Sequence, residues 1–76
     1  MNNTRRKVIE ALATKVEDLQ GEIQEVLDEE QEYRDNIPEG LSEGDYATRS
    51  DEAIENLEAA VNSLEDASGN LTDASN

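Results

Sequence analysis

Apolar residues recur along the first half of the chain at alternating spacings of three and four, the heptad pattern of an amphipathic helix. They are Ile9, Leu12, Val16, Leu19, Ile23, Val26, Tyr33 and Ile37. Glu30 occupies the one position of this series where an apolar residue is missing. Thr4 stands before the series as an N-cap, so the pattern predicts a helix over residues 4–35.

A second seam follows in the other half of the chain, formed by Ile54, Leu57, Val61 and Leu64. Beside it lies a row of small residues spaced by seven, Ala53, Ala60 and Ala67, which lets a partner helix approach closely. Ser42 followed three residues later by Asp45 resembles a capping box, and Ser68-Gly69 is typical of a helix C-terminus. We therefore expect a helix over residues 45–68 and a flexible tail over residues 69–76.

Residues 36–44 interrupt both patterns. Pro38 removes a backbone donor and disfavours helical geometry at Ile37, while Gly40 and Gly44 add backbone freedom. A short connection between two amphipathic helices returns the chain onto the same apolar seam. The sequence therefore predicts a single domain of the all-α class, an antiparallel, coiled-coil-like helical hairpin with its corner at residues 36–44.

One hairpin of this size has a weak core. Val8 and Leu27 flank the first seam and widen it beyond what contact with a single helix needs. Burial of about a dozen aliphatic side chains at 1.5–3 kcal/mol each opposes an ordering cost of about 1.5 kcal/mol per residue. We therefore expect a homo-oligomer, either a four-helix bundle made of two hairpins or a larger assembly.

Composition excludes several classes of function. The chain has 76 residues with neither Cys nor His, so thiol nucleophiles, imidazole bases and the best transition-metal ligands are all missing. A chain this short also buries too little surface to enclose a deep catalytic pocket. No apolar run approaches the roughly 20 residues that span a bilayer. We expect no enzyme, no cofactor, no metal site and no membrane insertion.

Charge narrows the choice of partners. Twenty acidic residues against six basic ones give a net charge of -14, which repels nucleic-acid backbones and anionic membranes. Direct nucleic-acid binding is therefore not expected. Three of the six bases are the consecutive Arg5, Arg6 and Lys7, for which we expect a role in solubility or in contact with the acidic face of a neighbouring subunit.

The corner gathers the aromatic residues and the remaining arginines. The candidate binding residues there are Tyr33, Arg34, Asn36, Tyr46 and Arg49. Rings and guanidinium groups together suit a small, planar, anionic ligand such as a nucleotide, or a hot spot for a host protein. The alternative is ordinary helix-end packing, because Glu30 to Arg34 and Asp45 to Arg49 have the spacing of stabilising ion pairs within a helix.

A second candidate is the acidic surface at Glu25, Glu29 and Glu32. It offers either a calcium site or an imitation of a nucleic-acid backbone that occupies a basic protein surface. The alternating Asp positions and fixed Gly of a calcium loop are missing. A solvated helix face is the simplest interpretation of these carboxylates.

The segment Tyr33-Arg34-Asp35-Asn36-Ile37-Pro38-Glu39-Gly40-Leu41, with Ser42, Glu43, Tyr46 and the run from Asp51 to Val61, resembles a group of small acidic helical-hairpin proteins of bacteriophages and phage-derived bacterial genes. The likeness covers residues 25–66. Gly40 stands where the group more often has Asn, and the chain after Asp66 is polar where relatives continue an apolar helix. The resemblance implies a phage context and a packed polar corner, and it supplies no catalytic residue or ligand.

Together these features favour a non-enzymatic phage accessory protein that blocks or sequesters a host component, as a counter-defence inhibitor does. Either the acidic surface or the Tyr and Arg corner would bind that component. The alternative is a structural or assembly protein whose helices pack into a larger bundle. In either case we expect the protein in the cytoplasm of an infected or phage-carrying bacterial cell.

Overall fold

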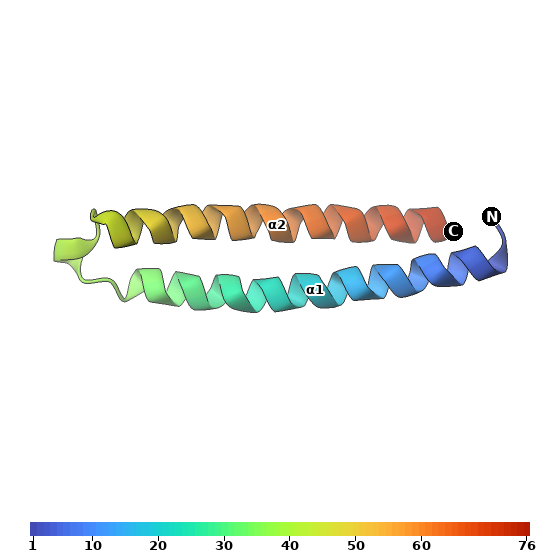
Figure 1. Ribbon diagram of the computed structural model, residues 1–76, viewed down its shortest axis with the longest axis horizontal. Helices are drawn as coiled ribbons and strands as arrows, with labels where there is room; N and C mark the ends of the chain where they lie inside the picture. Colours follow the sequence, from blue (N-terminus) through green and yellow to red (C-terminus); the bar gives the residue numbers. More distant parts are fainter.

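The computed structural model describes all residues from 1 to 76 as an antiparallel helical hairpin (Figure 1). Helix α1 spans Asn3–Asp35, a short 3-10 helix η1 spans Glu39–Leu41, and helix α2 spans Asp45–Ser75. The hairpin is a rod with Cα extents of 60 × 14 × 12 Å. The predicted all-α hairpin is confirmed, and its corner falls at residues 36–44 as the sequence predicts.

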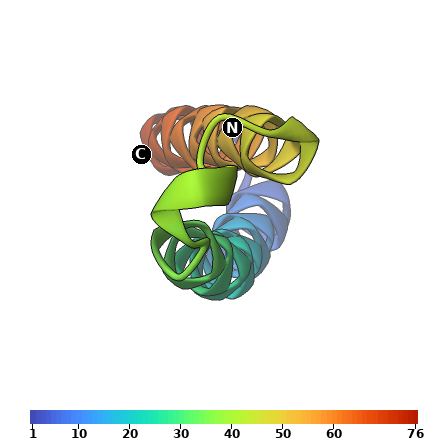
Figure 2. The same ribbon diagram turned by 90° about the vertical axis from the view of Figure 1, so that its left-hand side faces the viewer.

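The two helices wind slightly around each other. Seen along the rod, α1 and α2 lie one above the other and drift sideways in opposite directions between the corner and the chain ends (Figure 2). This shallow crossing is the geometry of helices that pack along a heptad seam.

The starts of both helices differ from the predicted caps. Asn2, and not Thr4, caps α1, because its side-chain oxygen accepts the backbone N–H of Arg5 at 2.7 Å. At α2 the N-cap is Gly44, which has no side chain to cap with. The predicted capping box does not form, because the Ser42 hydroxyl instead donates to the Glu39 carbonyl at 2.8 Å and closes η1.

Helix α2 continues two turns beyond its predicted end at Ser68, so the predicted tail over residues 69–76 is helical as far as Ser75. Gly69 does not stop the helix: no glycine in the chain adopts the positive φ of a left-handed C-cap. Ser68 is buried and donates to Glu17 Oε1 at 3.2 Å, and Leu71 one turn later is half-buried. These contacts with α1 hold the last turns in place.

The face of α1 that packs on α2 is only half of the one predicted. The residues on the inward side of α1 are Ile9, Ala13, Val16, Gln20, Ile23, Leu27, Glu30 and Arg34, and Ile37 in the connection continues the series. The prediction was right for the members spaced by seven from Ile9, and wrong for Leu12, Leu19, Val26 and Tyr33, which are exposed. Leu27, predicted to flank the seam, is instead its most buried aliphatic residue, at 4% exposure.

Helix α2 matches its predicted seam. Ile54, Leu57, Val61 and Leu64 all lie half-buried toward α1, and the inward series extends to Ala47 and Ser50 on one side and to Ser68, Leu71 and Ser75 on the other. Helix α1 turns its less apolar phase inward, and Glu30 and Arg34 on this phase find partners on α2. The Ser50 hydroxyl donates to Glu30 Oε2 at 3.3 Å, so that a half-buried carboxylate at the seam has a partner. The resulting core is thin, since no large side chain is fully buried.

Candidate functional site

Arg34, near the end of α1, binds both α2 and the connection between the helices. Its Nε donates to Asp51 Oδ1 at 2.7 Å, and its Nη2 donates to the Ser42 carbonyl at 3.2 Å. The side-chain hydrogen bond to Asp51 raises the pKa of Arg34 above its ordinary value, and the attraction of the Asp51 charge adds to this effect. The guanidinium therefore stays charged at any pH near neutrality, and its donors are directed at the protein itself.

The ion pairs within each helix that the spacing predicts do not form. Arg34 pairs across the hairpin with Asp51 and not with Glu30, and this is the only ion pair in the structure. Glu30 is instead the acceptor for Ser50, and Arg49 is left without an acidic partner. The two arginines of the corner therefore differ: Arg34 links the two helices, and Arg49 has no ion pair within the chain.

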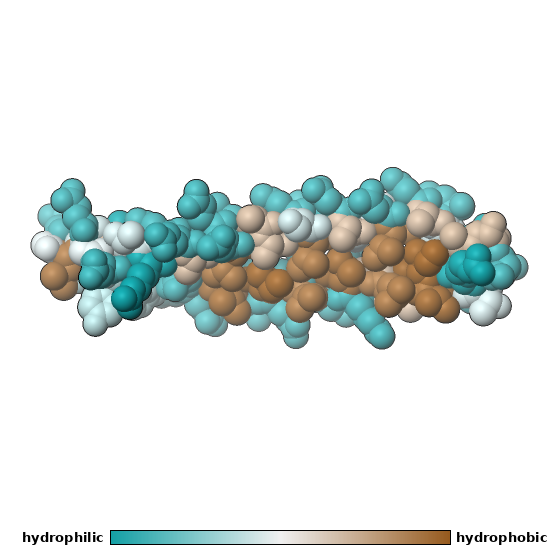
Figure 3. Space-filling model, turned by 45° about the horizontal axis from the view of Figure 1, so that its top comes forward, coloured by the Kyte–Doolittle hydropathy of each residue, from teal (hydrophilic) through white to brown (hydrophobic).

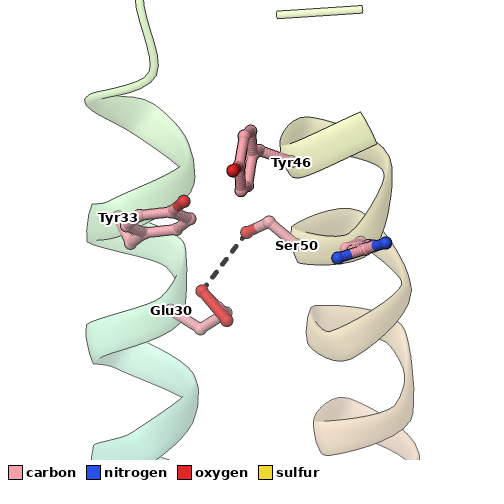
Figure 4. Close-up of a pocket in the computed structure, with 5 residues that line it drawn as sticks. Glu30, Tyr33, Tyr46 and Ser50 are labelled. Atoms are coloured by element: carbon pink, nitrogen blue, oxygen red, sulfur yellow. Dashed lines mark hydrogen bonds between the residues drawn. The ribbon is translucent and has the colours of Figure 1, made fainter. Parts of the chain in front are cut away.

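Tyr33 and Tyr46 face each other across an open pocket between the ends of α1 and α2 (Figure 4). The pocket has a volume of about 350 Å³ and is lined by Glu30, Tyr33, Tyr46, Arg49 and Ser50. Both rings are accessible, with Tyr33 50% and Tyr46 70% exposed. The hydrogen bond between Ser50 and Glu30 forms the floor of this corner pocket (Figure 4).

A second hollow lies on the other side of the same rings. It measures about 290 Å³ and is lined by Tyr33, Asn36, Ile37, Pro38, Leu41 and Tyr46. This hollow is mainly apolar, with the Asn36 amide as one of its polar groups. The two tyrosines thus form a wall shared by a charged pocket and an apolar one.

The structure brings together four of the five predicted corner residues. Tyr33, Tyr46 and Arg49 line the corner pocket, and Asn36 lines the adjoining hollow. Arg34 lines neither, because its donors are used by Asp51 and Ser42. Sequence reasoning missed Ser50 as a site residue, and the only signal for it was the unexplained carboxylate of Glu30 on the seam.

The predicted acidic surface lies on the side of α1 that faces away from α2. Glu25, Glu29 and Glu32 are exposed there, and Asp18 and Glu22 extend the series at helical spacing toward the N-terminus. The carboxylates form a line along the helix and do not converge, and no group of three or more in the chain could hold a metal ion. Solvent reaches every member, as in the simple interpretation of a solvated face.

A third feature, which we call the outer apolar stripe, runs along one face of the rod (Figure 3). Helix α1 contributes the exposed series Leu12, Leu19, Val26 and Tyr33, spaced by seven, and helix α2 contributes Tyr46, Ala53, Ala60, Ala67 and Ala74 at the same spacing. Tyr33 and Tyr46 line one pocket, so the two rows border the same side of the hairpin. Hydrophilic side chains flank this band on both margins (Figure 3).

Neither helix has an 18-residue window apolar enough for a membrane span. Comparisons of the chain with protein-family models, with curated proteins and with solved structures gave no match.

Proposed function

We propose that this chain is a non-enzymatic binding protein that sequesters a host component at its corner pocket, and that the component is a small, planar, anionic molecule of the nucleotide class. The observation that supports this most is the pairing of Tyr33 and Tyr46 across a pocket that also holds an arginine without an acidic partner. Two accessible rings can stack on a planar group, and a free guanidinium can bind a phosphate or carboxylate.

The charged groups around the pocket leave Arg49 without an ion pair, so its guanidinium can bind a ligand. Glu30 is the pocket's own carboxylate, and it already accepts a hydrogen bond from Ser50. Arg34, the neighbouring guanidinium, is held by Asp51, so ligand binding does not need to break the scaffold. A carboxylate is also a weak base for a serine hydroxyl near neutral pH, which favours binding over catalysis by Ser50 and Glu30.

The phage context of the proposal rests on the resemblance of residues 25–66 to small phage hairpin proteins. A protein that removes a host molecule by binding it needs no catalytic group, and a short acidic hairpin is sufficient scaffold for one site. Under this proposal the protein acts in the cytoplasm of an infected or phage-carrying bacterial cell, as an inhibitor in host–virus interaction.

Titration with a panel of purine and pyrimidine mono- and dinucleotides tests the ligand class. Tyrosine emission is a direct probe because Tyr33 and Tyr46 are the only aromatic residues in the chain. We expect quenching with at least one nucleotide, and a loss of about 1–3 kcal/mol of affinity in Tyr46→Ala and Arg49→Ala. Lys15→Ala removes an equal charge far from the pocket and serves as the matched control. Absence of quenching by the whole panel, or equal loss in the control, would contradict the proposal.

Binding of a host protein through the acidic surface is the second mode. Combined Glu25→Gln, Glu29→Gln and Glu32→Gln substitutions remove three charges from that face without shortening a side chain. If this mode operates, capture of a partner from bacterial lysate weakens in the triple variant and at raised salt, while Arg49→Ala captures normally. Mass spectrometry of small molecules carried by the captured protein distinguishes the two modes.

A structural or assembly function is the second candidate, and one observation favours it. The outer apolar stripe leaves Leu12, Leu19 and Val26 about half exposed along the middle of the rod. Exposed apolar bands of this kind mark surfaces that pack against another chain. If neither the corner nor the acidic variants change partner capture, packing into a larger bundle is the better description of the chain's function.

A further inference from the structure

The α1 row of the outer apolar stripe, Leu12, Leu19, Val26 and Tyr33, does not pack in the hairpin core. Its α1 members lie one residue before the inward positions of that helix, so they point beside α2 and not at it. Leu19, at the middle of the row, is 46% exposed. The opposite row on α2 consists of Ala residues between Tyr46 and the chain end, which leaves a shallow surface with large side chains along one edge and small ones along the other.

We propose that a second copy of this chain covers the outer apolar stripe, with the two hairpins antiparallel, so that the corner of each lies beside the chain ends of the other. The inference stands on the stripe and on the charge distribution, and it does not depend on ligand binding at the corner. A face measured by the 60 and 14 Å extents of the rod is comparable with the roughly 800 Å² that each partner buries in a stable interface.

Side-chain size along the stripe suits a two-fold pairing. Within one hairpin, the stripe consists of layers seven residues apart, each with one residue from α1 and one from α2. From the corner outward, the layers are Tyr33 with Tyr46, Val26 with Ala53, Leu19 with Ala60, and Leu12 with Ala67. A two-fold axis at the level of Leu19 and Ala60 places two large and two small side chains in each layer. Alternation of large and small residues across facing positions is the composition that fills a bundle core without voids.

The distribution of charge along the rod favours the antiparallel orientation of the two copies. Residues 28–52, which form the corner half, carry ten acidic residues against Arg34 and Arg49, a net charge of -8. Residues 1–15 and 62–76, at the other end of the rod, carry four basic and four acidic residues and are neutral in sum. A parallel dimer would set one -8 region against another. The antiparallel dimer separates them by the length of the rod and places each beside a neutral end.

The N-terminal bases gain a role in this arrangement. Arg5 continues the α1 row, seven residues before Leu12, and it is exposed. With the axis at Leu19, Arg5 of the second copy lies level with Tyr33 of the first. A guanidinium near an exposed tyrosine ring in an acidic region is favourable both as a cation–π contact and as an ion attracted by the surrounding carboxylates.

Spin-label distances test both the surface and the orientation, because the chain has no native cysteine. Gly40 and Gly21 are suitable label sites, since a Cβ added at either meets no atom within 4 Å. In the antiparallel dimer, labels on Gly40→Cys lie apart by nearly the 60 Å length of the rod. Labels on Gly21→Cys, at the level of the axis but on the side of α1 away from the stripe, lie apart only by the width of the two hairpins. A short distance from both sites would mean a parallel dimer, and no distance from Gly21→Cys would mean no dimer. Either result overturns the proposal.

Leu19→Glu, made in the Gly21→Cys chain, then tests the stripe itself. We expect the dimer Kd to rise at least about 100-fold, tenfold for each copy of the residue, and the short distance to disappear. Leu41→Glu makes the same change at an exposed leucine outside the stripe and should leave the distance unchanged. Retention of the distance in Leu19→Glu, or its loss in both variants, would exclude the stripe as the interface. If Leu19→Glu loses its helical circular dichroism, Leu12→Gln takes its place with the same expected result.

Discussion

Arg34 and Arg49 carry the same side chain at the same corner, and their surroundings give them different functions. Arg34 joins α1 to α2 through Asp51 and to the connection through the Ser42 carbonyl. Arg49 has no acidic partner and lines the corner pocket. The sequence spacing made both look like members of ion pairs within a helix, because spacing does not reveal that Asp51, 17 residues away, lies nearer to Arg34.

Alanine substitution should separate the two arginines. Arg49→Ala should change the free energy of unfolding by no more than about 0.5 kcal/mol, because an exposed side chain without a partner contributes little. Arg34→Ala should lower Tm by clearly more, since it removes the only ion pair and leaves the Ser42 carbonyl without its donor. Thermal melts followed by circular dichroism measure both. Equal effects on Tm would show that Arg34 is not a structural link.

At the scale of the helices, the sequence predicts α1, the corner and the inward face of α2 well. It predicts the inward face of α1 poorly, because Ile9, Val16, Ile23 and Ile37 fit two heptad phases equally. Choosing the phase with more large aliphatic residues selects the outer apolar stripe instead of the hairpin core. That choice fails because the inward phase of α1 is the less apolar one and includes Gln20, Glu30 and Arg34, so apolar content alone does not identify the face that packs on α2.

The end of α2 gives a test at the same scale. Deletion of residues 69–76 removes two helical turns and the half-buried Leu71. The Ser68-Gly69 pair had predicted that the helix ends before these residues. We expect the deletion to lower the free energy of unfolding by at least about 1 kcal/mol, from the apolar burial lost. In a domain of this size that corresponds to a fall in Tm of about 4–8 °C. An unchanged Tm, measured beside the full chain at equal concentration, would indicate that these turns do not pack on α1.

At the scale of the whole molecule, charge works against compactness. The net charge of -14 is spread over a rod with Cα extents of 60 × 14 × 12 Å, and only one carboxylate, Asp51, is in an ion pair. Screening should therefore stabilise the fold, because the Debye length falls from about 10 Å at 0.1 M salt to about 3 Å at 1 M. We expect Tm to rise between these concentrations of sodium chloride. A Tm that falls or stays constant would mean that attraction between the helices outweighs the repulsion of their carboxylates.

Oligomeric state is the property on which the outer apolar stripe has the largest effect. The thin core and the exposed apolar band are the observations that support the proposal of a second copy on this stripe. In the proposed dimer the acidic surface stays exposed, whereas the corner pocket, whose Tyr33 and Tyr46 end the stripe, lies beside the chain ends of the second copy.

Sedimentation equilibrium of the unmodified chain, from about 1 to 100 μM at neutral pH and moderate salt, tests most directly whether a second copy covers this stripe. The mass should reach twice the 8.4 kDa of one chain within that range and then stay constant, as expected for a closed two-fold dimer. A well-folded chain that remains at 8.4 kDa up to the highest concentration would contradict the dimer and leave the stripe as a surface for a different protein.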